Sequence, residues 1–181
     1  MIDSIIKILV RSQFVMTSRN HACKKAGKIV QSYGKLAGDL DHVRGTHRVA
    51  VPPMLGVDED MRNWSFYMIL EHNSIVNRTI TAIVKQLVRG ETLHGAATIN
   101  PKTDVMPSIS ADEKQLQIFQ RSVNKHLQVI RELGTLRGSR TAPHPIFGAF
   151  DAHKWNCMLP FHLQLHYKQA ALVVQMAQKD R

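Results

Sequence analysis

Apolar residues recur at steps of three and four along several long stretches, and this spacing constrains the fold of the chain more than any other feature. The stretches lie at residues 2–38, 60–89, 113–133 and 151–178, with a break in the first near 17–20. A step of three or four returns a side chain to the same face of an α-helix. No segment shows the alternation of a convincing strand. The sequence therefore predicts an all-α fold, formed as one domain over residues 1–181.

Two long connections separate these helices. Prolines and glycines mark residues 38–59 and 90–110 as loops. Each connection is about 20 residues long, which exceeds the 2–8 residues that usually join neighbours in a simple bundle. An extended segment of that length can run back along a helix of about 42 Å. We expect a four-helix bundle with long crossover loops, in which two neighbouring helices can be parallel.

The helix ends carry recognisable capping residues. Ser110 and Glu113 have the spacing of a capping box at the start of the third helix, and Asp151 is a candidate N-cap for the fourth. The second helix is expected to begin near Asp60. Pro160 lies inside the fourth helix, where it removes a backbone hydrogen bond to Asn156 and is expected to kink the helix.

The charge of the chain is strongly basic but diffuse. There are 24 Lys and Arg against 14 Asp and Glu, a formal net charge of +10, and aromatic residues make up only 6%. Without a dense basic tract or interleaved aromatics, we expect no specific nucleic-acid partner. Weak binding to polyanions stays open as an alternative.

The first residues are apolar but interrupted by charge. Asp3, Lys7 and Arg11 break the run that a signal peptide or a membrane span would need. We therefore expect a cytoplasmic protein with no membrane partner. In that compartment Cys23 and Cys157 are expected to be free thiols.

Ten histidines are present, and their helical phase selects three of them. His162 and His166 are four residues apart, so they share one helix face, and both fall on the inward stripe of the fourth helix. His72 has a similar inward position on the second helix. An unsatisfied buried polar group costs about 1–3 kcal/mol, and one shared metal ion would satisfy all three imidazoles. The competing interpretation is three separate core histidines, each bonded to a protein oxygen. His126 is a weaker candidate for a fourth neighbour and is more simply a histidine at a helix edge.

Two segments then resemble a known family. The segment 64–73, Trp-Ser-Phe-Tyr-Met-Ile-Leu-Glu-His-Asn, is similar to the second-helix motif of the DinB-like (YfiT-like) metalloenzyme superfamily, in which Trp-Ser precedes a His by eight residues. The segment 144–169, which begins His-Pro-Ile-Phe-Gly and contains Trp155 and the His162/His166 pair, is similar to the last helix of that family and its lead-in.

The resemblance implies an up-down-down-up bundle in which His72, His162 and His166 hold a divalent metal. Zinc and nickel are the ions that imidazole ligands favour. The resemblance also implies homodimers and, for some relatives, transferase or isomerase activity with a low-molecular-weight thiol. Around the site, Gln169 is the best candidate to orient a ligand, and Trp64 and Tyr67 are candidates to line a pocket.

The sequence thus predicts a metal-binding helical protein that acts as a metal-dependent transferase or hydrolase on an unidentified small-molecule substrate. No carboxylate stands out as a general base, because Glu71 lies next to His72 but off its helix face. Two alternatives remain: a non-catalytic, stress-related or dimerisation module, and a basic protein that binds polyanions weakly.

Overall fold

A computed structural model describes residues 2–38, 40–91, 100 and 103–179. The described residues are predominantly helical, which confirms the all-α prediction. The helices are α1 (Ile2–Met16), α2 (Arg19–Gly38), α3 (His42–Thr46), α4 (Phe66–Arg89), α5 (Lys114–Glu132) and α6 (Ala152–Ala177), with a short 3-10 turn η1 at Glu59–Met61. The break between α1 and α2 falls where the sequence predicts it.

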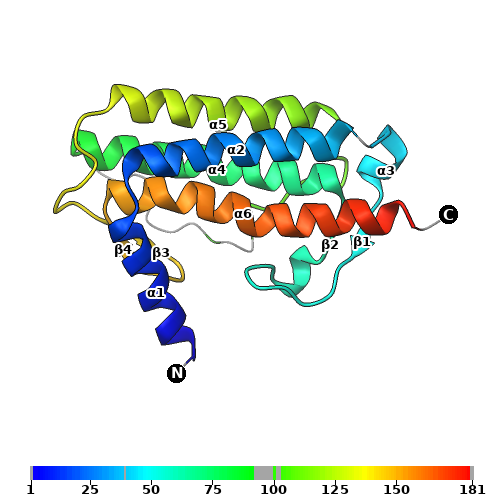
Figure 1. Ribbon diagram of the computed structural model, residues 1–181, viewed down its shortest axis with the longest axis horizontal. Helices are drawn as coiled ribbons and strands as arrows, with labels where there is room; N and C mark the ends of the chain where they lie inside the picture. Colours follow the sequence, from blue (N-terminus) through cyan, green and yellow to red (C-terminus); the bar gives the residue numbers. More distant parts are fainter. Residues whose placement is uncertain (1, 39, 92–99, 101–102, 180–181) are drawn as a thin grey trace.

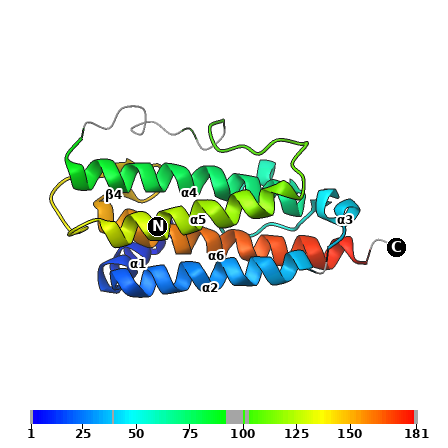
Figure 2. The same cartoon turned by 90° about the horizontal axis from the view of Figure 1, so that it is seen from above.

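The long helices α2, α4, α5 and α6 lie side by side in both views (Figures 1 and 2). Helix α4 packs against both α5 and α6, and α2 packs against α6 and α5. In Figure 1, α2 and α6 run from left to right, whereas α4 and α5 run from right to left. Helix α1 leaves one end of this group at a steep angle.

The start of α4 differs from the expectation. The helix begins at Phe66 and not near Asp60, because Ser65 is its N-cap and accepts a hydrogen bond from the backbone N–H of Met68 at 3.2 Å. Trp64 therefore precedes the helix. It lies in the two-residue strand β2 (Asn63–Trp64), which pairs antiparallel with β1 (Val49–Ala50).

A second pair of short strands precedes α6. Strand β3 (Ala142–His144) pairs antiparallel with β4 (Gly148–Phe150), and His144 lies opposite Gly148. Gly148 has a φ of 76°, a left-handed conformation that closes a three-residue hairpin loop and favours glycine. The expectation of no strand is wrong at these two places, because strands of two or three residues are too short to show an alternating pattern.

Of the two N-terminal caps that the sequence predicts, the one of α6 forms and the one of α5 does not. Asp151 caps α6 by accepting a hydrogen bond from the Lys154 N–H at 2.9 Å, as predicted. The capping box of α5 does not form. Glu113 instead lies 2.6 Å from His42 Nδ1, and Asp112 accepts the Lys114 N–H at 3.0 Å. Helix α6 continues through Pro160.

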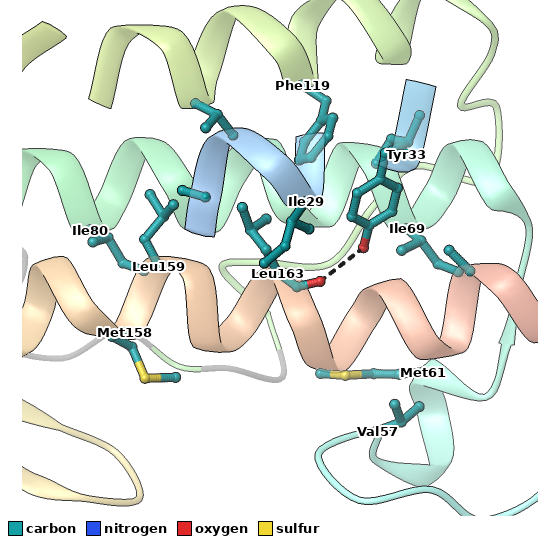
Figure 3. Close-up of a cluster of buried hydrophobic side chains, with 14 of the residues drawn as sticks. Ile29, Tyr33, Val57, Met61, Ile69, Ile80, Phe119, Met158, Leu159 and Leu163 are labelled. Carbon is teal, nitrogen blue, oxygen red and sulfur yellow. Dashed lines mark hydrogen bonds between the residues drawn. The ribbon is translucent and has the colours of Figure 1, made fainter. Parts of the chain in front are cut away.

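A buried tyrosine joins all four of the long helices α2, α4, α5 and α6. Tyr33 of α2 is fully buried, and its hydroxyl donates to the Leu163 carbonyl of α6 at 3.3 Å (Figure 3). The same hydroxyl accepts a hydrogen bond from Asn73 Nδ2 of α4 at 3.0 Å. The ring packs edge-on against Phe119 of α5, with centroids 4.9 Å apart. Because both hydrogen bonds are directional, they fix how α4 and α6 are aligned along their lengths.

Membrane crossing is not a feature of these helices. None of them, within the described part of the chain, is both long and apolar enough to span a bilayer.

His126 is a core histidine of α5. It is buried, with its ring nitrogens 2.9 Å from Thr81 Oγ1 and 3.1 Å from Asn156 Oδ1. It therefore links α5 to α4 and α6 through protein oxygens. The expectations that it lies at a helix edge or joins the other histidines as a fourth neighbour are both wrong. Burial lowers the pKa of His126 to about 4.

This burial makes stability depend on pH. The pKa of His126 is lower in the folded chain than the 6.5 of a free histidine, so the unfolded chain binds more protons between these values. Stability is therefore complete above about pH 6.5 and falls as the pH drops toward 4. Between pH 6.5 and 4, we expect the free energy of unfolding of the His126→Gln variant to fall by roughly 3 kcal/mol less than that of the unmodified protein.

Urea unfolding in EDTA at a series of pH values measures this difference. His21→Gln, at an exposed position of α2, is the control and should keep the original pH slope. Equal slopes for His126→Gln and the unmodified protein would contradict the assignment of a neutral, buried His126.

Candidate metal centre

Three imidazoles meet between α4 and α6. His72 comes from α4, and His162 and His166 come from successive turns of α6. One ligand nitrogen of each lies within 4.8 Å of the others, and His72 Nε2 is 3.2 Å from His162 Nε2. A tetrahedral zinc ion with bonds of 2.0–2.1 Å separates its ligand nitrogens by about 3.3 Å. The His72–His162 spacing therefore fits two ligands of one ion, and the cluster could hold a metal ion.

The outer nitrogens of two imidazoles are bonded to protein oxygens. His72 Nδ1 is 2.7 Å from the Val105 carbonyl, and His166 Nδ1 is 2.8 Å from Gln169 Oε1. A carbonyl oxygen only accepts hydrogen bonds, so each Nδ1 carries the proton, and each Nε2 presents a lone pair. Gln169 Nε2 in turn donates to the Met61 carbonyl at 2.7 Å, which fixes the orientation of the amide. Gln169 thus lies where a ligand-orienting residue is expected.

Of the three histidines, His162 has the fewest hydrogen bonds to protein oxygens. Its Nδ1 is buried and has no hydrogen-bond partner among the described residues, while its Nε2 points at the lone pair of His72. In the absence of a cation, Nε2 of His162 must carry its proton and donate to His72. For His162 to bind a cation through Nε2 as a neutral ring, this proton would have to move to Nδ1.

All three imidazoles are neutral near pH 7. Burial, with a smaller contribution from His166, lowers the pKa of His72 to about 3. Burial also lowers the pKa of His166 to about 4. For His162, burial and then the neighbouring His166, His72 and His144 hold the pKa well below its ordinary value. Metal ligands must be deprotonated, so the lone pairs are available at neutral pH.

The two aromatic candidates occupy different places. The Trp64 ring lies 5.0 Å from the His72 ring and stacks on His166 at 6.4 Å with an interplanar angle of 22°, so it covers one side of the cluster. Tyr67 faces away, against Gly45 of α3, where an added Cβ would collide with its ring. Tyr67 precedes His72 by five residues, about 140° around the helix. Its predicted place in the pocket is therefore wrong.

A cavity of about 730 Å³ opens beside the imidazoles. Its walls come from α1, the segment around η1, α4, the β3–β4 hairpin and α6. They are largely apolar, and include Leu55, Met61, Val76, Phe147, Phe161 and Leu165. Lys7 and Asp58 are the charged residues among the described lining. Sequence reasoning missed Asp58 and the role of the hairpin, because loop segments have no periodic pattern that places them beside a helix face.

Helix α1 is attached to the hairpin side of this cavity. Arg11 Nη1 donates to the Phe147 carbonyl at 2.5 Å and to the Ala149 carbonyl at 3.2 Å. The Phe14 ring meets Phe161 of α6 edge-on, with centroids 5.6 Å apart. The first helix is thus a wall of the cavity, although most of its apolar side chains face outward.

The cysteines lie outside the cluster. Both thiols are free, as predicted. Burial raises the pKa of Cys157 to about 12 and also raises that of the half-buried Cys23. Neither forms a thiolate near pH 7, so neither has the character of a nucleophile or a metal ligand.

Comparison of the chain with family models, with curated proteins and with solved structures finds no match. The chemistry of the site is therefore inferred from its own geometry. Three neutral imidazoles, covered on one side by Trp64 and bordered on the other by a cavity, could hold a metal ion.

Gln169 should contribute to stability without any ligand. Replacing it with Leu, which has a similar volume, leaves His166 Nδ1 and the Met61 carbonyl buried without partners. We expect Gln169→Leu to lower the free energy of unfolding by about 2 kcal/mol or more. The measurement is urea unfolding in EDTA. Gln117→Leu on the exposed face of α5 is the matched control, expected within about 0.5 kcal/mol of the unmodified protein. Equal stability of the two variants would show that the hydrogen bonds of Gln169 are not formed.

Proposed function

We propose that this protein is a metal-dependent enzyme of the DinB-like type, with His72, His162 and His166 as ligands of a zinc or nickel ion. One observation carries the proposal: three neutral imidazoles present nitrogens within 4.8 Å of one another at the wall of a large apolar cavity. Separate structural histidines do not need to converge, and His126 illustrates how this chain satisfies one with protein oxygens alone.

The arrangement of the long helices supports the same family. We propose that α2, α4, α5 and α6 form an up-down-down-up four-helix bundle. The opposite directions of the pairs α2/α6 and α4/α5 in Figure 1 favour that topology. Homodimer formation and a cytoplasmic location remain predictions from the sequence.

The protein residues would have distinct roles. A bound ion would supply a Lewis acid that polarises a water, a thiol or a carbonyl group. Val105 and Gln169 hold the ring orientations of His72 and His166 through their Nδ1 protons. Trp64 keeps water from one side of the cluster, and the apolar cavity walls favour a substrate that is mostly hydrocarbon. We propose a transferase or hydrolase reaction, with a low-molecular-weight thiol as the candidate co-substrate.

Elemental analysis of protein purified without a histidine tag tests the metal site. We expect about one zinc or nickel ion per chain, and loss of that ion in His162→Ala, because the remaining pair of imidazoles binds far more weakly. His21→Ala, at an exposed position, is the control and should retain the ion. Circular dichroism establishes that both variants are folded. Folded protein that takes up neither zinc nor nickel on dialysis, or full metal content in His162→Ala, contradicts the proposal.

Turnover separates an enzyme from a non-catalytic module. Metal-loaded protein is supplied with thiol and electrophile pairs, and product is measured against His162→Ala. An enzyme gives turnover that disappears in the variant. A structural metal site gives no turnover in either, and chelation then lowers only the melting temperature.

A further inference from the structure

His144 has a fixed proton position. At the end of β3, its Nδ1 lies 3.2 Å from the backbone nitrogen of Ile146 and 3.3 Å from that of Phe147. Both backbone N–H groups donate, so Nδ1 accepts them with its lone pair. The proton of the neutral ring must then be on Nε2. The hairpin turn, and not the solvent, selects this tautomer.

Within the described part of the chain, the Nε2–H group makes no hydrogen bond. His144 lines the cavity, with its ring held 5.2 Å from the Trp155 ring and 5.0 Å from the Phe147 ring. No acceptor for Nε2 is found among the described residues. Burial lowers the pKa of His144 to about 4, so the ring is neutral near pH 7. A residue of the cavity wall thus carries a donor whose proton position is fixed and which a bound molecule can use.

The charge balance of the cavity favours an anion. The three ligand imidazoles are neutral, so a divalent ion held by them keeps its full positive charge. Lys7 and Asp58 are the charged residues of the described lining. Asp58, which acts electrostatically on His166, would offset at most one of the two positive charges of such an ion. A buried cation without a negative partner is costly. A negatively charged oxygen ligand in the cavity would compensate for it.

We propose that the cavity binds a small apolar carboxylate, with one oxygen accepting the Nε2–H of His144 and the other facing the His72, His162 and His166 cluster. The hydrocarbon part packs against the apolar walls, including Phe147, Phe161 and Leu165. This assignment rests on the proposed metal-dependent function, whereas the proton position of His144 is independent of any metal.

The tautomer is tested first, on metal-free protein in EDTA near pH 7. Long-range proton–nitrogen NMR correlation distinguishes a protonated from an unprotonated ring nitrogen. We expect Nε2 of His144 to carry the proton, assigned by its disappearance in His144→Asn. A protonated Nδ1 overturns the proposal whether or not the protein binds metal.

Ligand binding is tested with 4-phenylbutyrate as the probe. The two tryptophans of the chain both lie at the site: Trp155 lines the cavity, and Trp64 packs on His72 and His166. Their fluorescence reports occupancy. In zinc-loaded protein we expect saturable binding of 4-phenylbutyrate, and weaker binding of the neutral 4-phenylbutanamide.

The variant His144→Asn separates the acceptor role of Nδ1, which holds the turn, from the donor role of Nε2, which we propose binds the carboxylate. An Asn Oδ1 can accept the same backbone N–H bonds and preserve the turn, but it offers no donor at the position of Nε2. We expect its affinity for 4-phenylbutyrate to fall by about 10- to 100-fold, with an unchanged melting temperature and metal content. His21→Asn should bind the probe as the unmodified protein does.

The outcomes distinguish this proposal from the proposed function. Unchanged probe affinity in His144→Asn, or equal affinity for the acid and the amide, overturns the carboxylate assignment while the metal site stands. Absence of metal uptake overturns the proposed function and with it the cluster-facing oxygen. In that case the NMR result alone decides the assignment of His144.

Discussion

The alignment of α4 on α6 is the constraint on which the site depends, and a single hydroxyl group defines it. Tyr33 bonds to Asn73 on one helix and to Leu163 on the other. These residues are the sequence neighbours of His72 and His162. A slip of one residue in either helix would break a buried hydrogen bond and also rotate an imidazole by about 100°. The core thus enforces the meeting of the histidines, and the meeting does not require a metal to assemble it.

The same histidines also hold two of the long connections between helices in place. His72 bonds to the Val105 carbonyl, in the connection between α4 and α5. His166 acts through Gln169 on the Met61 carbonyl, in the connection that precedes α4. Long connections usually bury little, but the first of these is held against α4 by His72 and the second against α6 by Gln169. The hydrogen bonds that give the buried imidazoles their partners therefore also fix the position of the cavity walls.

Helical periodicity alone is sufficient to predict the long helices, their inward faces and the three histidines, because these depend on local backbone geometry. It does not predict α3, a five-residue helix within the expected loop 38–59. It failed where the backbone is not helical. Trp64 reaches the site from a strand that Ser65 separates from α4, so its helical phase had no meaning. Tyr67 is helical, but its phase of about 140° from His72 places it on a different face of α4. His144 could not be placed, since two backbone N–H groups of a hairpin determine its role and no spacing rule encodes them.

The attachment of α1 to the hairpin has a consequence for how such a site can diversify. The three imidazoles come from α4 and α6, whereas Ile6 and Lys7 of α1 contribute to the cavity wall. Arg11 holds that wall to backbone carbonyls, which any hairpin sequence provides. Substitutions of Ile6 or Lys7 can therefore change the shape and charge of the cavity wall without altering the imidazoles. The cavity wall and the imidazole cluster are thus built from segments that lie far apart in the sequence, so one can be altered without the other.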